Sequence, residues 1–262
     1  MNLDLGSRRA LVCGSSQGIG RAVAIELAGL GAEVGLLARD GEGLERVRRM
    51  LDAARGQAHR VLVADFRRPE AVRSVVTGFL AESGPVHILV NNTGGPPPGP
   101  ASEADPDAYL AAFTQHLVCN QVLVQAVVPG MKAAAYGRII NIVSTSVRQP
   151  IRGLGVSNTI RGAVASWAKT LAGELGQFGI TVNNVLPGST KTGRLAAVFE
   201  GRARARGVPV CEIEAEERAA IPLGRFAEPE ELASAVAFLA SPAAAYISGV
   251  NLPVDGGRTQ CL

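Results

Sequence analysis

The hydrophobic residues of this chain gather in short apolar runs, and longer segments of mixed polarity separate the runs. Apolar runs without polar alternation indicate strands that are buried on both faces, and the amphipathic segments between them indicate helices. The predicted strands cover residues 9–13, 33–38, 60–64, 87–91, 138–144, 180–186 and 249–254. The predicted helices cover residues 20–30, 41–54, 69–82, 106–134, 159–177 and 229–239.

The alternation of strands with helices of this length predicts the fold class. It is typical of an α/β protein, here a Rossmann-type, doubly wound parallel sheet of about seven strands with helices on both faces. No linker, repeat or shift in composition divides the sequence, so residues 1–262 are predicted to form a single domain. Hydrophobic residues make up 47% of the chain, which is enough to build a sizeable core.

Charge and cysteine content narrow the choice of partners and location. The formal net charge is only +3 and the basic residues are scattered, which argues against nucleic acid as a partner. Cys13, Cys119, Cys211 and Cys261 lie far apart without metal-binding spacing, so neither a disulfide framework nor a bound metal is expected. We find no signal-peptide pattern and no stretch of about 18 uncharged apolar residues. We therefore expect a cytoplasmic protein with no membrane partner.

A glycine-rich turn between the first predicted strand and helix is the first candidate site. It reads Gly14-Ser15-Ser16-Gln17-Gly18-Ile19-Gly20. Glycine permits positive φ and lets backbone amides approach a ligand closely, and the helix that begins here directs free N–H groups and its positive dipole end at the turn. In this strand–turn–helix context the turn predicts a dinucleotide site. We assign Gly14, Ser16, Gln17, Gly18, Ile19 and Gly20 to it, and the alternative is a plain tight turn.

The end of the second predicted strand favours NADP over NAD. In dinucleotide folds an acidic residue at this place binds the ribose hydroxyls, whereas an arginine accommodates a 2′-phosphate. Ala38 occupies the usual acidic position and Arg39 follows it, with a guanidinium that can donate two hydrogen bonds to a phosphate. Two alternatives stay open: Arg39 is a solvated loop charge, or Asp40 binds the ribose and the cofactor is NAD.

Further motifs make nearly the whole chain resemble the short-chain dehydrogenase/reductase family, and within it the bacterial 3-oxoacyl-carrier-protein reductases. The resemblance implies cofactor roles for residues that follow the third, fourth and sixth strands. Asp65 with Phe66 would lie at the adenine, and Asn92 and Gly94 of Asn91-Asn92-Thr93-Gly94 would line the cofactor. The remaining motifs are Asn183, Pro187-Gly188-Ser189-Thr190-Lys191-Thr192, Pro222-Leu223-Gly224-Arg225-Phe226 and Val254-Asp255-Gly256-Gly257. Pro187, Gly188, Thr190 and Thr192 would meet the nicotinamide and the pyrophosphate.

The catalytic positions of that family are largely replaced. Ser144 stands where the family has its serine, but the Tyr-x-x-x-Lys motif is aligned with Ser157-Asn158-Thr159-Ile160-Arg161. His116 is aligned with the family's asparagine on the preceding helix. The resemblance therefore implies a catalytic set of Ser144, Ser157, Arg161 and His116, in which Arg161 also holds the nicotinamide ribose.

These replacements change the expected proton chemistry. A phenol has a pKa of about 10, which a nearby cation lowers into a useful range, whereas a serine hydroxyl is much less acidic. Arginine keeps the positive charge but does not readily exchange a proton. His116 could take over this role, because the ordinary pKa of histidine is about 6.5. The alternatives are a helix histidine without a catalytic part and a dead site that has drifted.

Two other stretches are candidates for a substrate site. Gly94-Gly95-Pro96-Pro97-Pro98-Gly99-Pro100 follows the fourth strand and is either a stiff rim of the site or a structural connector. Residues of about 189–221 lie where the family carries its substrate lid. The segment contains Arg202, Arg204 and Arg206, which either form a solvated helical face or bind an anionic acyl carrier.

Three functions remain open from the sequence. The first is an NAD(P)-dependent oxidoreductase with an altered proton relay, acting on a small carbonyl or hydroxyl substrate that could be acyl-carrier-linked. The second is a non-catalytic NADP(H)-binding sensor or scaffold, which the missing tyrosine favours. The third is a lyase or isomerase without net hydride transfer. The resemblance also implies a homo-oligomer, a dimer or tetramer, formed through helices 106–134 and 157–177.

Overall fold

A parallel sheet of seven strands lies at the centre of the computed structural model, which describes residues 1–261. The strand order β3-β2-β1-β4-β5-β6-β7 changes direction between β1 and β4, and parallel doubly wound sheets bind their ligands at the carboxyl end of such a switch point. The strands are β1 (Arg9–Cys13), β2 (Glu33–Ala38), β3 (Arg60–Val63), β4 (Ile88–Asn91), β5 (Gly137–Ile142), β6 (Ile180–Pro187) and β7 (Asn251–Val254). The predicted fold class is confirmed.

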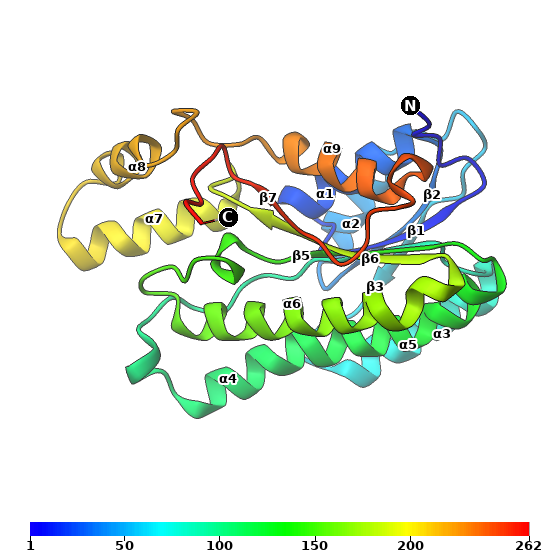
Figure 1. The fold of residues 1–262 in the computed structure, drawn as a ribbon, viewed down its shortest axis with the longest axis horizontal. Helices are drawn as coiled ribbons and strands as arrows, with labels where there is room; N and C mark the ends of the chain where they lie inside the picture. Colours follow the sequence, from blue (N-terminus) through cyan, green and yellow to red (C-terminus); the bar gives the residue numbers. More distant parts are fainter. Residues whose placement is uncertain (262) are drawn as a thin grey trace.

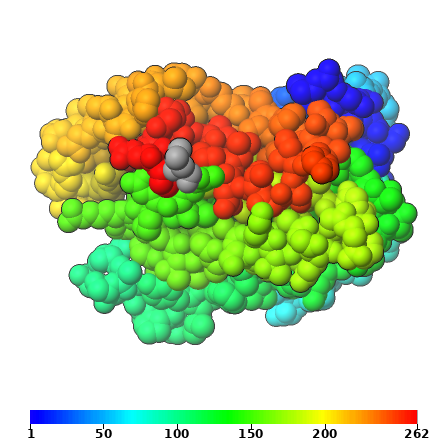
Figure 2. Space-filling model, viewed as in Figure 1, coloured from blue at the N-terminus to red at the C-terminus, as the bar shows by residue number. Residues whose placement is uncertain are grey.

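Helices cover both faces of the sheet (Figure 1). One face carries α1 (Gly18–Gly29), α2 (Gly41–Arg48) and α9 (Pro229–Ala240), and the other carries α3 (Pro69–Ser83), α5 (Cys119–Ala133) and α6 (Gly155–Leu175). In the same view α4 (Pro106–Phe113) continues the line of α5, while α7 (Gly193–Arg206) and α8 (Val210–Ala219) extend beyond the sheet. The latter two form the yellow and orange end of the molecule in Figure 2.

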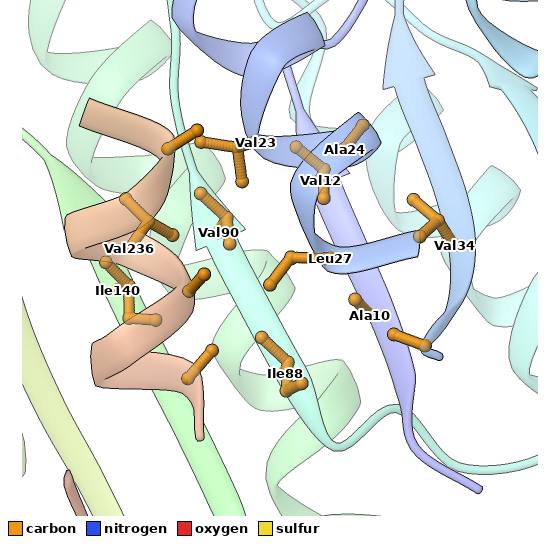
Figure 3. Close-up of a cluster of buried hydrophobic side chains, with 14 of the residues drawn as sticks. Ala10, Val12, Val23, Ala24, Leu27, Val34, Ile88, Val90, Ile140 and Val236 are labelled. Carbon is orange, nitrogen blue, oxygen red and sulfur yellow. The ribbon is translucent and has the colours of Figure 1, made fainter. Parts of the chain in front are cut away.

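Strand residues alternate between the two halves of the core because successive side chains point to opposite faces of a sheet. In β1, Ala10 and Val12 pack under α1 and α9, whereas Leu11 and Cys13 face α3 and α5. Figure 3 shows the first of these halves, where Val23, Ala24 and Leu27 of α1 and Val236 of α9 lie over β1, β2, β4 and β5. This packing holds the start of α1, and therefore the glycine turn, against the sheet.

A row of asparagine side chains crosses four neighbouring strands inside the sheet. Asn91 Nδ2 donates to Asn141 Oδ1 over 2.8 Å, Asn141 Nδ2 donates to Asn184 Oδ1 over 2.9 Å, and Asn184 Nδ2 donates to Asn251 Oδ1 over 2.7 Å. The four residues are direct partners in the β4–β5, β5–β6 and β6–β7 ladders. We call this row the asparagine ladder. It requires one register, because a slip by one residue would turn each amide to the other face.

The helix predicted over residues 41–54 ends earlier, at Arg48. The last turn tightens, since Met50 N donates to Val47 O and Leu51 N to Arg48 O. Asp52 then accepts from Ala54 N over 2.8 Å, a local side-chain-to-backbone bond that competes with helix continuation. The prediction extended the helix too far because it relied on the spacing of hydrophobic residues, which does not reveal a competing turn.

The single helix predicted over residues 106–134 is interrupted by a π-helical turn, Thr114–Val118, between α4 and α5. A π turn holds one extra residue and is uncommon except at functional sites. His116 lies inside this turn and is only 2% exposed. The wider turn thus directs a histidine inward from a helix whose outer side is solvated.

Helix α6 begins at Gly155, before the predicted start at residue 159. No side chain caps it, so the sequence carries no start signal. The start is fixed instead by the loop that follows β4: Gly99 N donates to Gly153 O over 2.7 Å, and Gly155 N donates to Gly99 O over 2.9 Å. The proline-rich stretch is thereby tied to the helix that carries Ser157 and Arg161.

The asparagine ladder predicts a large loss of stability on truncation at its centre. Asn141→Ala leaves Asn91 Nδ2 and Asn184 Oδ1 buried without their partners, and we expect a loss of about 2–5 kcal/mol in the free energy of unfolding, measured by urea denaturation. Asn251→Ala, at the partly exposed end of the row, should cost less than half as much. Equal losses in the two variants would show that the ladder does not act as a buried network.

Candidate functional site

The glycine turn has the geometry that the sequence predicts for it. Gly14 and Gly18 have φ values of +59° and +56°, which favour glycine. A Cβ placed on Gly20 would lie 2.2 Å from Gly14 O, so helix and turn touch backbone to backbone. Asn92 Nδ2 donates to Cys13 O and Gly14 O, both over 3.3 Å, and fixes the turn from the neighbouring strand end.

The first turn of α1 leaves its backbone donors available. Gln17, at the N-cap position, has extended backbone and makes no side-chain cap, and the first turn carries no acidic residue. The first N–H groups of a helix lack partners within the helix and bind anions well, with the helix dipole in support. The turn with Ser16, Gln17 and Ile19 therefore fits the diphosphate of a dinucleotide.

The structure assigns Asp40 to a capping role. Its side chain accepts from Gly43 N over 2.9 Å at the start of α2. Arg39 is exposed and forms no ion pair within residues 1–261. Because the Asp40 carboxylate caps α2, it is not available to bind a ribose. The neighbouring Arg39 guanidinium suits a 2′-phosphate. Of the two interpretations left open by the sequence, this geometry favours NADP.

Asp65 lies between two arginines at the end of β3. Hydrogen bonds from Arg67, first from its side chain and then from its backbone, lower the pKa of Asp65 to about 2, and Arg39 adds to the effect. Phe66 is 8% exposed and belongs to the core, and its carbonyl accepts from Cys119 Sγ over 3.0 Å. A role of Phe66 at the adenine would therefore involve its backbone.

The segment after β6 reaches back to the glycine turn. Thr192 Cγ2 lies 3.3 Å from where a Cβ on Gly18 would stand, and Thr192 caps α7 by accepting from Leu195 N. Thr190 is buried, and Gly188 packs so closely on Asp255 that a Cβ would come within 2.7 Å of its Cα. Pro187 ends β6 and Gly94 O accepts from Gln115 Nε2, so these predicted residues border the carboxyl end of the sheet.

Arg161 lies behind the strand ends, almost fully buried. Its Nη1 donates to Ile142 O over 2.9 Å and its Nη2 to Thr93 O over 3.3 Å, so it joins the ends of β5 and β4. Burial, and next the charge of Arg194, lower the pKa of Arg161 to about 10. The residue stays a cation at neutral pH, as expected from the sequence.

His116 contacts the same strand end. Its Nδ1 lies 2.5 Å from Thr93 Oγ1. Burial, followed by the nearby charge of Arg161, lowers its pKa to about 2. The ring is therefore neutral near pH 7, and it can donate or accept a hydrogen bond but does not carry a spare proton. This environment was not visible in the sequence, which suggested an ordinary histidine pKa.

The two predicted serines differ in their local roles. Ser144 follows β5 and its Oγ accepts from Ser146 N over 3.1 Å, which fixes the backbone after the strand. Ser157 is partly buried and lies one helical turn before Arg161 on α6. Ser144, Arg161 and His116 therefore lie around the ends of β4 and β5, whereas no hydrogen bond joins Ser157 to these strand ends among the described residues.

The sequence argument did not single out Arg194, which also reaches this region. Arg194 stands in the first turn of α7, and its Nη2 donates to Pro96 O over 2.7 Å. Its position two residues after Thr192 was the available signal, because Thr192 marks the cofactor side of the segment. The proline-rich loop is thus held from two sides, by α7 and by α6.

The arginine row of the predicted lid is mostly neutralised within the lid. Arg202 pairs with Glu217 over 3.0 Å, and Arg206 pairs with Glu216. Glu217 is 8% exposed and also accepts from Ser189 Oγ over 2.7 Å and from Arg258. This network ties α7, α8 and the C-terminal segment together. Arg202 and Arg206 are therefore structural ion-pair partners in this conformation, and only Arg204 of the row has no ion pair among the described residues.

No group of three or more His, Cys, Asp or Glu side chains among residues 1–261 is arranged to bind a metal ion. No helix in the same range combines the length and hydropathy needed to cross a bilayer.

Known proteins resemble this chain over nearly its full length. Residues 14–259 match the family model described as enoyl-(acyl carrier protein) reductase. The 3-oxoacyl-[acyl-carrier-protein] reductase FabG of Vibrio cholerae is 34% identical, over 98% of this chain and 98% of its own. L-Sorbose reductase from Gluconobacter frateurii, solved with NADPH and L-sorbose, superposes with a TM-score of 0.91 at 31% identity and 100% coverage of both chains.

A further solved structure is YwfH, an NADPH-dependent reductase involved in bacilysin biosynthesis. It superposes with a TM-score of 0.92 at 28% identity, over 97% of this chain and 99% of its own. The L-sorbose reductase structure contains NADPH, and YwfH is described as NADPH-dependent. Both agree with the NADP-type cofactor expected from the sequence.

The contact between Gly20 and Gly14 predicts that a single methyl group will disturb the site. We expect Gly20→Ala to weaken NADPH binding at least about tenfold, because the added carbon displaces the turn. Gly29→Ala is the matched control on the same helix, since nothing lies within 4 Å of its added carbon, and it should stabilise the protein by up to about 1 kcal/mol. Calorimetric titration measures NADPH binding, which Gly29→Ala should leave unchanged, and urea denaturation measures the stability of Gly29→Ala. Unchanged binding by Gly20→Ala would contradict this geometry.

The buried His116 predicts an acid-sensitive fold. Between pH 6.5 and 2 the unfolded chain binds a proton at this residue that the folded chain does not, so stability falls as the pH drops below 6.5. From pH 7 to pH 5 the wild type should lose about 2 kcal/mol more unfolding free energy than His116→Asn. Urea denaturation at the two pH values measures the difference. Parallel losses would mean that His116 is protonated in the fold.

Proposed function

This chain belongs to the short-chain dehydrogenase/reductase family of oxidoreductases, and we propose that it is an NADP(H)-dependent enzyme that reduces a carbonyl group, or oxidises the corresponding hydroxyl, without the usual tyrosine. When bound, the nicotinamide supplies or accepts the hydride. The substrate is a small molecule. The family relation supports the reaction class, and the residues of this chain support the choice of cofactor and the altered proton chemistry.

The observation that carries the proposal is the intact dinucleotide site. Gly14, Gly18 and Gly20 keep a turn in which only glycine fits, and the first turn of α1 leaves its donors free. Asp40 is occupied as a helix cap, while Arg39 forms no ion pair with any residue that the structure describes. A site that had lost its ligand would be under no such constraint, so the turn supports a protein that still binds NADP(H).

The proton chemistry follows from the charges around the strand ends. Arg161 is a buried cation beside neutral His116, and no tyrosine or lysine lies at the two replaced positions. A positive charge lowers the free energy of an oxyanion that develops in the reaction. We propose that Ser144 and Arg161 polarise the carbonyl and that Arg161 also orients the cofactor ribose. Ser157 and neutral His116 then hold the water that delivers the proton.

A second candidate is a non-catalytic protein that binds NADP(H) as a sensor or scaffold. The observation in its favour is the replacement of the tyrosine by Ser157, because a serine is a weak acid and is shorter. The same cofactor site serves both candidates. Turnover, rather than binding, separates them.

The predicted assembly into dimers or tetramers also stays part of the proposal. Two large apolar side chains of α4 support it, since Leu110 is 65% exposed and Phe113 is 40% exposed. Exposed apolar residues that lie close together on one helix favour contact with another chain.

The cofactor assignment predicts a selective effect of Arg39. We expect Arg39→Ala to raise the Kd for NADPH about tenfold to a hundredfold, the cost of losing charge-assisted hydrogen bonds worth about 1.5–3 kcal/mol, while the Kd for NADH stays unchanged. Calorimetric titration with each nucleotide measures the split. An equal effect on both nucleotides would contradict a 2′-phosphate contact.

The same titrations on the wild type test the proposed function. Binding of neither nucleotide would overturn both candidates. NADPH binding together with oxidation of NADPH by carbonyl compounds, lost in Ser144→Ala, supports the enzyme. Tight NADPH binding without oxidation across aldehydes, ketones and oxoacids supports the sensor instead.

A further inference from the structure

Two guanidinium groups lie close to Gly95, in the loop that follows β4. A Cβ placed on Gly95 would lie 3.3 Å from Arg194 Nη2 and 3.9 Å from Arg161 Nη2. The two side chains come from different helices, α7 and α6, and both are anchored to backbone carbonyls, Arg194 to Pro96 O and Arg161 to Thr93 O. A glycine between them keeps the space open.

This arginine pair, Arg161 and Arg194, has no counter-ion among residues 1–261. No carboxylate lies within 4.0 Å of either guanidinium in the part of the chain that the structure describes. Arg161 is buried, and the charge of Arg194 adds to burial in lowering its pKa. Arg194 is exposed, so only Arg161 is poorly solvated. The charge of Arg194 raises the free energy of the buried Arg161 cation in the unliganded state, and an anion bound to both groups relieves it.

The position of the pair separates it from the cofactor diphosphate. Thr192 lies against Gly18 of the phosphate-binding turn, whereas Arg194, two residues later, contacts the loop after β4 at Gly95 and Pro96. His116 and Arg161 meet the same strand end through Thr93. The pair is therefore on the side of the predicted catalytic residues, where the substrate rather than the diphosphate would lie.

We propose that Arg194 and Arg161 bind a carboxylate of the substrate, so that the compound this protein reduces is an oxoacid rather than a neutral ketone or a thioester. This inference rests on the proposed reductase function and narrows its substrate class. Guanidinium groups bind carboxylates through paired, charge-assisted hydrogen bonds, which fix the orientation as well as the affinity. A carboxylate held at Gly95 would present the neighbouring carbonyl to the residues at the ends of β4 and β5.

The test is calorimetric titration of the full-length protein saturated with NADP⁺, which prevents turnover during binding. The probes are pyruvate, phenylpyruvate and 2-oxoglutarate, each beside its methyl ester. We expect at least one acid to bind about tenfold or more tightly than its ester. Arg194→Ala should reduce that acid to the affinity of the ester, and Arg194→Lys, which keeps the charge but loses the planar fork, should lie between.

The matched control is Arg204→Ala, an exposed arginine of the same helix without an ion pair among the described residues, which should bind acids as the wild type does. The Kd for NADP⁺ should stay within about twofold in all three variants, because no cofactor phosphate is involved. A parallel loss of NADP⁺ affinity in Arg194→Ala would assign the pair to the cofactor and overturn the proposal.

The other outcomes are equally distinct. Equal affinity for acids and esters, or no binding of any acid to a protein that binds NADP⁺, would overturn the oxoacid proposal and leave the reductase function standing. A wild-type protein that does not bind NADP⁺ would overturn the proposed function itself, and this inference with it.

Discussion

The asparagine ladder fixes the register of four neighbouring strands, and the site lies at the carboxyl ends of these strands. Each amide of Asn91, Asn141 and Asn184 donates to the next strand, so these strands share one register inside the sheet. The segments that follow them hold Thr93, Ser144 and the turn after Pro187. Because buried amides must keep their partners, the strand ends cannot shift independently of one another. The geometry around Arg161, which bridges two of these ends, depends on this constraint.

The site combines a glycine-rich cofactor turn with an unusual pattern of charge. The glycine turn needs close backbone contact and leaves no room for a methyl group at Gly20. The end with the proposed catalytic residues holds two arginines, a neutral histidine and two serines, and so it offers positive charge and hydrogen bonds rather than a group that titrates near pH 7. In the proposed mechanism, these groups stabilise a developing oxyanion by charge and water delivers the proton.

The sequence predicted the parts that depend on local pattern. The strand and helix order and the glycine turn follow from hydrophobic periodicity and residue type, and the proposed phosphate-binding role of Arg39 rests on the same kind of signal. The sequence could not decide the role of Asp40, because a cap and a ribose ligand use the same carboxylate. It also missed Arg194, whose contact with Pro96 spans segments far apart in the chain. The arginine row looked available until the structure showed Arg202 and Arg206 paired with glutamates of α8.

The π-helical turn at Thr114–Val118 has a consequence for how this protein tolerates change. A π turn uses one residue more than an α turn, so deleting a single residue here would restore regular helix and keep α4 and α5 in about the same orientation. Ala112 of α4 would then still pack on Val156 and Ile160 of α6. His116, which lies in the wide turn, would lose its position beside Thr93. The deletion of one codon in this turn would therefore change the site while it leaves the packing of α4 in place.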